Sequence, residues 1–200
     1  MSRSVDPYAN TTGIDVIVLL SGGLDSAVAL YLTIDKYGER NVDTVTFDYG
    51  QAHRVEIESA HWISDVAGVS NRVIPISSLD TTRMVVPGRN IIFLTYAATL
   101  SDHLIIGVSK SDYYDFPDCR CATLRALQET LTLALNQPIS IETPLIYLTK
   151  KEVVLLAAEL GVPIGLTHTC YRGAPPCKKC PACVLRVRGF REAGIDDIHS

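Results

Sequence analysis

A loop rich in glycine and serine offers the first sign of chemistry in this chain. Ser21-Gly-Gly-Leu-Asp-Ser26 directly follows an apolar run at residues 15–20. Glycines let backbone N–H groups approach an anion closely, and the partial positive charge at the start of a following helix adds to the attraction. The hydroxyls of Ser21 and Ser26 can donate to the same oxygens. The loop indicates a phosphate site, and a tight turn with Ser26 as a helix N-cap is the alternative.

Four of the six cysteines lie in one short segment, at Cys170, Cys177, Cys180 and Cys183. Four thiolates around one ion form a structural zinc site with no open position. The alternatives are an iron–sulfur cluster, which the tight spacing without a following Cys-Pro disfavours, and a redox-active Cys-x2-Cys pair. Cys119 and Cys121 lie outside this segment, and simple packing explains Cys121.

Composition restricts the class of protein. Hydrophobic residues make up 47% of the 200 residues and charged residues 20%, as in soluble globular proteins. A formal net charge of −4 favours a small-molecule substrate over stable nucleic-acid binding. Residues 1–13 lack the apolar run of a signal peptide, and we find no stretch long enough to span a membrane. We therefore expect a cytoplasmic protein, in which clustered cysteines bind metal before they form disulfides.

The elements that must position these residues alternate regularly between strand and helix. Short apolar runs rich in β-branched residues predict strands at 15–20, 42–47, 72–76, 103–108 and 139–142. Apolar residues at helical spacing predict helices at 26–37, 52–66, 90–100, 124–135 and 150–160. This alternation predicts an α/β fold with a Rossmann-like, doubly wound parallel sheet of about five strands. Such sheets bind ligands at the carboxyl ends of their strands.

The segment around the clustered cysteines differs from the rest of the chain. Glycine, proline and cysteine replace the periodic pattern at residues 169–183. We expect a flexible tail at 1–13, a catalytic domain at 14–168 and a small zinc-binding appendage at 169–200 that belongs to the same domain.

At the first strand-to-helix turn, SGGLDS resembles the loop of the PP-loop ATP pyrophosphatases, and it differs from both the Walker A and the GxGxxG patterns. The resemblance implies that this loop binds ATP and holds the departing pyrophosphate. Because Asp25 is an anion within an anion site, we assign it to Mg²⁺ or to water around the metal, with Ser26 as its catalytic partner. The implied nucleotide-binding residues are Leu20, Ser21, Gly22, Gly23, Leu24, Asp25 and Ser26.

Other segments resemble one family, the 7-cyano-7-deazaguanine synthases (preQ0 synthases, the QueC family), over about residues 16–194. In order, they are Phe47-Asp-Tyr-Gly-Gln51 with His53 and Glu56, Val86-Pro-Gly-Arg-Asn90, Asp112-x5-Asp118-Cys-Arg120, Glu142-Thr-Pro-Leu145, Thr149-Lys150, Cys170-Tyr171 and Cys183-x2-Arg186. Any one of them is weak, but their shared order is specific. Residues 79–86 and 100–103 are short for the family.

The resemblance implies a reaction in which 7-carboxy-7-deazaguanine and ammonia give the nitrile while two ATP are consumed. The carboxylate is adenylated and ammonia displaces AMP; the amide oxygen is then adenylated, and loss of AMP leaves the nitrile. Each step needs a good leaving group and a stabilised pyrophosphate, so one loop can serve both. The implied cofactors are ATP, Mg²⁺ and structural Zn²⁺, and we expect a homodimer.

Roles within the site follow from the resemblance and from position. Phe47 and Tyr49 are expected to border the adenine. Arg89 and Asn90 precede a predicted helix and can meet phosphate or substrate, with a surface ion pair as the alternative for Arg89. The expected substrate contacts are Gln51, Asp118 and Arg120. Lys150 can reach ATP phosphate or cap a turn, and His53 is either a general base or a structural residue on a helix.

Three other functions stay open at this point. A PP-loop variant could stop at the amide, particularly with a short 79–86 segment. A tRNA thiolase of the same fold would adenylate a base and use Cys180 and Cys183 as its persulfide pair, but the acidic charge does not favour binding to RNA. A zinc-stabilised binding module would not need SGGLDS.

Overall fold

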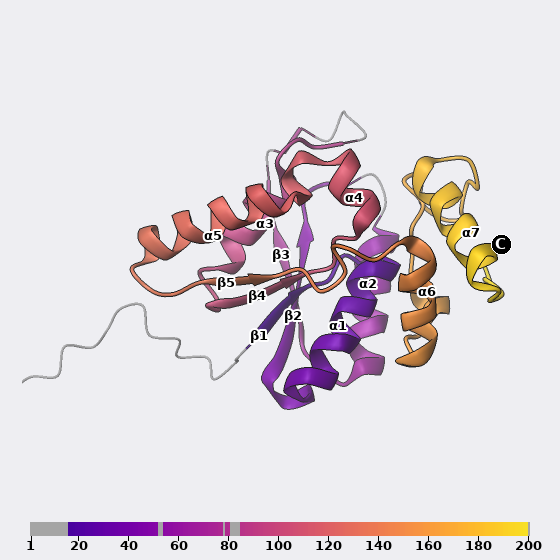
Figure 1. The fold of residues 1–200 in the computed structure, drawn as a ribbon, viewed down its shortest axis with the longest axis horizontal. Coiled ribbons are helices and arrows are strands. Elements are labelled where there is room, and N and C mark those ends of the chain that lie inside the picture. The colour runs from indigo at the N-terminus through magenta and orange to yellow at the C-terminus, as the bar shows by residue number, and fades with distance from the viewer. Residues whose placement is uncertain (1–15, 52–53, 78, 81–84, 200) are drawn as a thin grey trace, which may run out of the picture.

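A computed structural model describes residues 16–51, 54–77, 79–80 and 85–199 of the chain. Within these residues, five strands form one parallel sheet in the order β3-β2-β1-β4-β5 (Figure 1). The strands are β1 (Val16–Leu19), β2 (Val42–Asp48), β3 (Asn71–Pro75), β4 (His103–Ile106) and β5 (Ser140–Glu142). The predicted α/β fold with a Rossmann-like parallel sheet is therefore confirmed.

Helices cover both faces of this sheet. They are α1 (Leu24–Tyr37), α2 (Val55–Ala67), α3 (Arg89–Ala97), α4 (Lys110–Asp115), α5 (Cys121–Leu135), α6 (Lys150–Glu159) and α7 (Pro181–Ala193). Short 3₁₀ turns lie at Glu39–Asn41, Pro117–Cys119 and Ile164–Leu166. The sequence pattern did not predict α4, which has only six residues, or α7, which begins within the segment rich in glycine, proline and cysteine.

The alternation of side chains along β1 shows how two cores form. Val16 and Val18 point to one face, where they pack with α1, α2, α6 and Phe190 of α7. Ile17 and Leu19 point to the other face, where they pack with α3 and α5. Because every residue of β1 is buried on one side or the other, this strand reads as a continuous apolar run.

The order of the strands locates the site. The chain passes from β1 to β2 and β3 on one side, and then crosses to β4 and β5 on the other side of β1. This reversal leaves a crevice at the carboxyl end of β1, where α1 begins. The loops that follow β1, β2, β4 and β5 begin at that edge, and they carry or lead into the Ser21–Ser26 loop, Tyr49, Gln51, Asp118, Arg120 and Lys150.

Some predictions fall outside the described residues. They are the tail at 1–13, His53, and part of the short segment at 79–86. In the part of the chain that the structure does describe, no helix combines the length and the apolar character that a membrane span requires.

Candidate active site

Hydrogen bonds among its own serine and glycine residues fix the conformation of the loop Ser21–Ser26, which we call the phosphate loop. The backbone N–H of Ser21 donates to Ser26 Oγ at 3.2 Å, and the two serine hydroxyls lie 3.0 Å apart. Ser26 Oγ donates to the carbonyl of Gly23, and Gly23 N–H approaches Ser21 Oγ at 3.4 Å. Donors therefore gather at the start of α1, which is the arrangement an anion requires.

Two glycines are required by packing around this loop. Gly22 has a φ of +81°, and a Cβ there would overlap the carbonyl oxygen of Glu56 in α2. Gly107 follows β4, and its Cβ would lie 2.7 Å from the carbonyl oxygen of Asp25. The loop is thus pressed between α2 and the end of β4. In contrast, Gly23 has an ordinary φ of −82° and room for a methyl group, so nothing within the protein itself demands glycine there.

Asp25 and Lys150 form an ion pair at the centre of the site. Lys150 Nζ lies 2.5 and 2.6 Å from the two carboxylate oxygens of Asp25, and the two side chains are only 13% and 14% exposed. Asp112 is near both, with Oδ2 accepting hydrogen bonds from the N–H and the hydroxyl of Ser109. Burial, and next the charge of Asp25, raise the pKa of Asp112. Lys150 thus pairs with Asp25, and Asp112 lies within the electrostatic influence of both groups.

The residues at the end of β2 and in the turn that follows it contact one another and the start of α3. Phe47 is buried, and its ring stacks on Phe93 with centroids 4.3 Å apart, so its contact with adenine stays a prediction. Gln51 closes the turn, since its amide accepts from Tyr49 N–H at 2.9 Å and donates to the carbonyl of Phe47 at 3.2 Å. The Tyr49 hydroxyl accepts from Arg89 Nη1 at 2.8 Å, and burial raises its pKa.

The start of α3 brings together three of the predicted residues. Asp118 Oδ2 accepts the backbone N–H of Asn90 at 3.0 Å, and Asn90 Nδ2 donates to Cys119 Sγ at 3.1 Å. Arg89 lies over the rings of Tyr49 and Phe93. Arg120 is exposed, with Nε 3.4 Å from the carbonyl of Tyr113.

Three further residues at this edge, Glu56, Asp112 and Tyr171, could be recognised in the sequence only as members of motifs. Burial raises the pKa of Glu56, against the nearby charge of Arg89. Burial also raises the pKa of Tyr171, followed by the charge of Asp112. An acidic or phenolic group beside a half-buried arginine is a signal of function only once the fold has brought the segments together.

Other predicted nucleotide contacts lie deeper. Leu20 and Leu24 are buried in the core beside the loop, and the backbone N–H of Leu20 donates to the carbonyl of Val45. Their contact with ATP stays a prediction.

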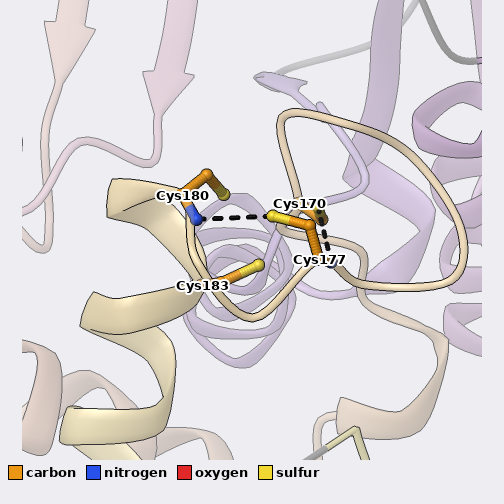
Figure 2. Close-up of side chains that lie close together, drawn as sticks. All are labelled: Cys170, Cys177, Cys180 and Cys183. Carbon is orange, nitrogen blue, oxygen red and sulfur yellow. Dashed lines mark hydrogen bonds between the residues drawn. The ribbon is translucent and has the colours of Figure 1, made fainter.

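The four clustered cysteines converge at the start of α7, where Cys180 is the N-cap and Cys183 lies in the first turn (Figure 2). Their sulfur atoms all lie within 4.8 Å of one another, and a tetrahedral ion with bonds of about 2.3 Å would hold them about 3.8 Å apart. Backbone N–H groups of Arg172 and Cys177 donate to Cys170 Sγ, and that of Cys180 donates to Cys177 Sγ.

The thiols of this cluster have divergent acidities. Backbone N–H groups of Lys179 and Cys180 lower the pKa of Cys177 to about 6. Burial and the neighbouring sulfurs raise the pKa of Cys183 to about 12. Four sulfurs this close cannot all be anionic without a cation between them, so the donor set suits a metal ion.

A buried arginine fixes the segment before the cluster. Arg186 forms two hydrogen bonds with the Asp197 carboxylate, at 2.7 and 3.0 Å. It also donates to the hydroxyls of Thr167 and Thr169. Together these contacts anchor the C-terminal residues to the strand-like segment that leads into Cys170.

Comparisons with known proteins point to one family. The family profile for queuosine biosynthesis protein QueC matches residues 15–83 and 78–194. The 7-cyano-7-deazaguanine synthase of Chromobacterium violaceum is 40% identical over 212 aligned residues, which cover 90% of this chain and 91% of that protein. That of Laribacter hongkongensis is 39% identical, with 90% and 92% covered.

Two solved structures resemble the fold. NMN synthetase from Francisella tularensis has a TM-score of 0.58 at 15% identity, with 94% of this chain and 80% of that one covered. The U34-tRNA thiolase NcsA from Methanococcus maripaludis, solved with its 4Fe-4S cluster, has a TM-score of 0.55 at 20% identity, with 91% and 66% covered. At these identities the likeness concerns the fold alone.

Proposed function

Because the chain belongs to the QueC family of queuosine biosynthesis proteins, we propose that it converts 7-carboxy-7-deazaguanine and ammonia into 7-cyano-7-deazaguanine with two ATP. The relatives named above carry that activity in their names, and they match this chain over nearly its whole length. We propose that the reaction takes place in the cytoplasm, without stable binding of nucleic acid, and that the protein is a homodimer.

The phosphate loop carries this proposal. Ser21–Ser26 lies at the start of α1, at the point where the order of the strands reverses, and its backbone and hydroxyl donors converge there. A Cβ at Gly23 would make only ordinary contacts beside those donors, at 3.4 and 3.5 Å. We assign this loop to the β- and γ-phosphates of ATP, which leave as pyrophosphate when a substrate oxygen attacks the α-phosphate.

The pair of Asp25 and Lys150 supplies the charges that this chemistry needs. The ammonium group of Lys150 already pairs with Asp25, and the charge of Asp112 acts nearby, so the site attracts a cation. Asp25 would hold Mg²⁺ when nucleotide is bound, and the ion would offset the charge of the phosphates. Lys150 would then be free to donate to a phosphate oxygen, as a flexible point charge does in other phosphate sites.

The substrate is assigned to the side of the site formed by the start of α3 and the turn before α5. Arg89 and Asn90 face this side and would orient the carboxylate for attack on ATP. Gln51, Asp118 and Arg120 would contact the guanine-like ring. Ammonia then attacks the acyl adenylate, AMP leaves, and the amide oxygen repeats the attack on a second ATP.

We assign the cysteine cluster to structural zinc. Each cysteine of a 4Fe-4S cluster binds a different iron, which holds the sulfurs further apart than ligands that share a single ion. The mutual separations of no more than 4.8 Å support a single ion. A thiolase with Cys180 and Cys183 as its persulfide pair would have to give up two of these four ligands. Cys119 offers no substitute, because burial raises the pKa of its thiol to about 12.

Product analysis tests the proposal. Purified protein would be given the carboxylate substrate, ammonium, ATP and Mg²⁺, with no sulfur donor and no RNA. Mass spectrometry should detect the amide first and then the nitrile, with two AMP and two pyrophosphate per nitrile. Amide as the final product would indicate the variant that stops early. Turnover that depends on a sulfur donor and tRNA would overturn the proposal in favour of a thiolase.

A further inference from the structure

A glycine in the middle of α7 has no explanation within its own helix. Gly189 is buried, and it lies between the buried residues Arg186 and Phe190. Its φ is not among the positive values in the described residues, so the backbone does not require glycine. Only proline is a poorer helix former in a helix interior. A contact outside α7 must therefore account for the missing side chain.

That contact is the side chain of Lys150. A Cβ at Gly189 would overlap Lys150 Cγ, and it would also lie 3.1 Å from Lys150 Cβ and 3.2 Å from the backbone carbonyl carbon of Lys150. Helices α6 and α7 run side by side at the edge of the molecule (Figure 1). The stem of Lys150 thus passes through the space that Gly189 leaves open, and its ammonium group then reaches Asp25 in the phosphate loop.

The place of Lys150 in α6 is unfavourable for that helix itself. It is the first residue after the N-cap Thr149, where the partial positive charge of the helix repels a cation. Its burial beside Asp25 depends on the surfaces that confine it, and α7 provides one of these surfaces.

The same face of α7 carries the metal ligand Cys183. Cys183, Arg186 and Gly189 follow one another at intervals of three residues, and all three are buried. A second connection runs through His168, whose backbone N–H donates to the carbonyl of Gly22 at 2.8 Å. The His168 ring nitrogen Nε2 lies 3.1 Å from the carbonyl of Cys170. The cysteine-bearing segment therefore contacts the phosphate loop at Gly22 and, through Lys150, at Asp25.

We infer that Gly189 is a positioning residue for Lys150, and that α7 and its cysteine cluster hold the phosphate loop in its working shape through this contact. The inference rests on the proposed ATP chemistry, and it adds a role for the C-terminal segment beyond the stability of the fold.

A double-mutant cycle on Gly189→Ala and Lys150→Ala tests it. In the presence of Lys150, Gly189→Ala should lower kcat for pyrophosphate release by between about tenfold and about a hundredfold, because the ammonium group is displaced. In the Lys150→Ala background, Gly189→Ala should change kcat by less than about twofold. Val184→Ala, at an exposed position of α7, is the matched control and should keep the wild-type rate.

Thermal unfolding of the same four proteins provides a readout that needs no reaction. Gly189→Ala should lower the melting temperature more when Lys150 is present than in Lys150→Ala, which removes the overlap with Cγ and keeps the tighter-than-usual contacts with Cβ and the backbone carbonyl carbon. If the single variant fails to fold and the double variant folds, the clash with Lys150 is confirmed. If both fail to fold, Gly189 serves another contact and the inference is wrong.

The outcomes also separate this inference from the proposed function. Equal losses in both backgrounds would mean that Gly189 has only a general structural role, while the proposed function stands. A wild-type protein that releases no pyrophosphate with the carboxylate substrate would overturn the proposed function, and the positioning role in catalysis with it.

Discussion

Two clusters of polar and charged residues lie at opposite ends of α1, and they differ in how their carboxylates are stabilised. Near the amino end of β4, the carboxylate of Glu142 accepts hydrogen bonds from Tyr37 at 2.9 Å and Lys36 at 3.0 Å, and it lies 2.8 Å from His103 Nε2. Burial by itself would raise the pKa of Glu142, but these hydrogen bonds outweigh it and lower the pKa. We call these four residues the Glu142 cluster.

At the other end of α1, two carboxylates act on each other. Asp25 pairs with Lys150, Asp112 accepts hydrogen bonds from Ser109, and burial and the charge of Asp25 raise the pKa of Asp112. We call Asp25, Asp112 and Lys150 the Asp25 cluster.

The pKa of the central carboxyl group is lowered in the Glu142 cluster, while the pKa of Asp112 is raised in the Asp25 cluster. In the Glu142 cluster each donor relieves the charge of one carboxylate, so the arrangement stabilises the folded chain. In the Asp25 cluster the charge of Asp25 acts on the buried Asp112 and raises its pKa, which is unfavourable for the charged form of Asp112 in the folded chain and is a common feature of functional sites. The predictions below compare the two clusters and the loop beside them.

The largest expected effect is the difference between two lysines, Lys150 and Lys36, each of which pairs with a carboxylate. Lys150→Met should lower kcat for pyrophosphate release by at least about a hundredfold, because a donor to the transferring phosphates is lost. Lys36→Met should leave kcat unchanged, since its cluster lies away from the loop. Steady-state pyrophosphate release would be measured on protein shown by circular dichroism to be folded. Equal losses in the two variants would remove the distinction between the clusters.

The next effect concerns the metal. Cys180→Ser should lower the unfolding free energy by several kcal/mol, a part of the roughly 10 kcal/mol that structural zinc gives to small peptides, because the sheet core persists. The wild type should contain about one zinc per chain by elemental analysis. Cys121→Ser lies outside the cluster and is the matched control, with a change of less than about 1 kcal/mol. Full stability in the metal-free protein would contradict a structural zinc.

The two loop glycines should separate folding from function. Gly22→Ala forces a side chain into a left-handed conformation against α2, and should lower the unfolding free energy by about 2–4 kcal/mol. Gly23→Ala should stay within about 0.5 kcal/mol of wild type, because its Cβ makes only ordinary contacts, at 3.4 and 3.5 Å.

Gly23→Ala should have a large effect on catalytic activity although its effect on stability is small. Its Cβ would stand where a phosphate is expected, so pyrophosphate release should fall by at least about tenfold in Gly23→Ala at normal stability. Urea unfolding and a pyrophosphate assay on both variants measure this. A fully active Gly23→Ala would place the anion elsewhere.

The smallest effect is a difference in pH dependence. Because the folded pKa of Glu142 is lowered, its contribution is present above its unfolded pKa of about 4.3 and is lost as the pH falls from there through the lower, folded pKa. Glu142→Gln should therefore reduce stability at neutral pH by less than about 1 kcal/mol, and by less at acid pH, since the carboxylate is partly exposed.

Asp112 should behave in the opposite sense. Its folded pKa is raised, so its charge destabilises the folded chain above that pKa and the penalty disappears as the pH falls. Asp112→Asn should increase stability at neutral pH by about 0.5–1 kcal/mol, because the amide oxygen can accept the same bonds from Ser109. Urea midpoints at two pH values measure both variants. A loss of stability in Asp112→Asn at neutral pH would contradict the contrast.

The sequence predicted the sheet well because its signals are local. β1 is a continuous apolar run and the loop after it carries SGGLDS, so fold, loop and cysteine cluster could all be read without contacts. The helix α7 was missed because Pro181 and the cysteines before it resemble a loop, although proline in the first turn is favourable for a helix.

The relations within the site could not be read in this way. The pairing of Asp25 with Lys150 joins segments that lie far apart in the chain, and no periodicity encodes it. The same holds for Gly189, whose meaning appears only against the stem of Lys150. For Phe47, which lies near the end of β2, the structure adds a ring contact with Phe93 that no local pattern encodes, while its contact with adenine stays a prediction.

The central claim is that this edge of the sheet transfers AMP to an oxygen of the substrate, and isotope transfer tests it most directly. With both carboxylate oxygens of 7-carboxy-7-deazaguanine labelled with ¹⁸O, the first AMP released should carry one labelled oxygen. The amide keeps the other, and the second AMP should remove it, which leaves an unlabelled nitrile. Mass spectrometry of AMP and pyrophosphate would show label in every AMP and none in pyrophosphate. Unlabelled AMP, or label in a phosphate product, would contradict the account.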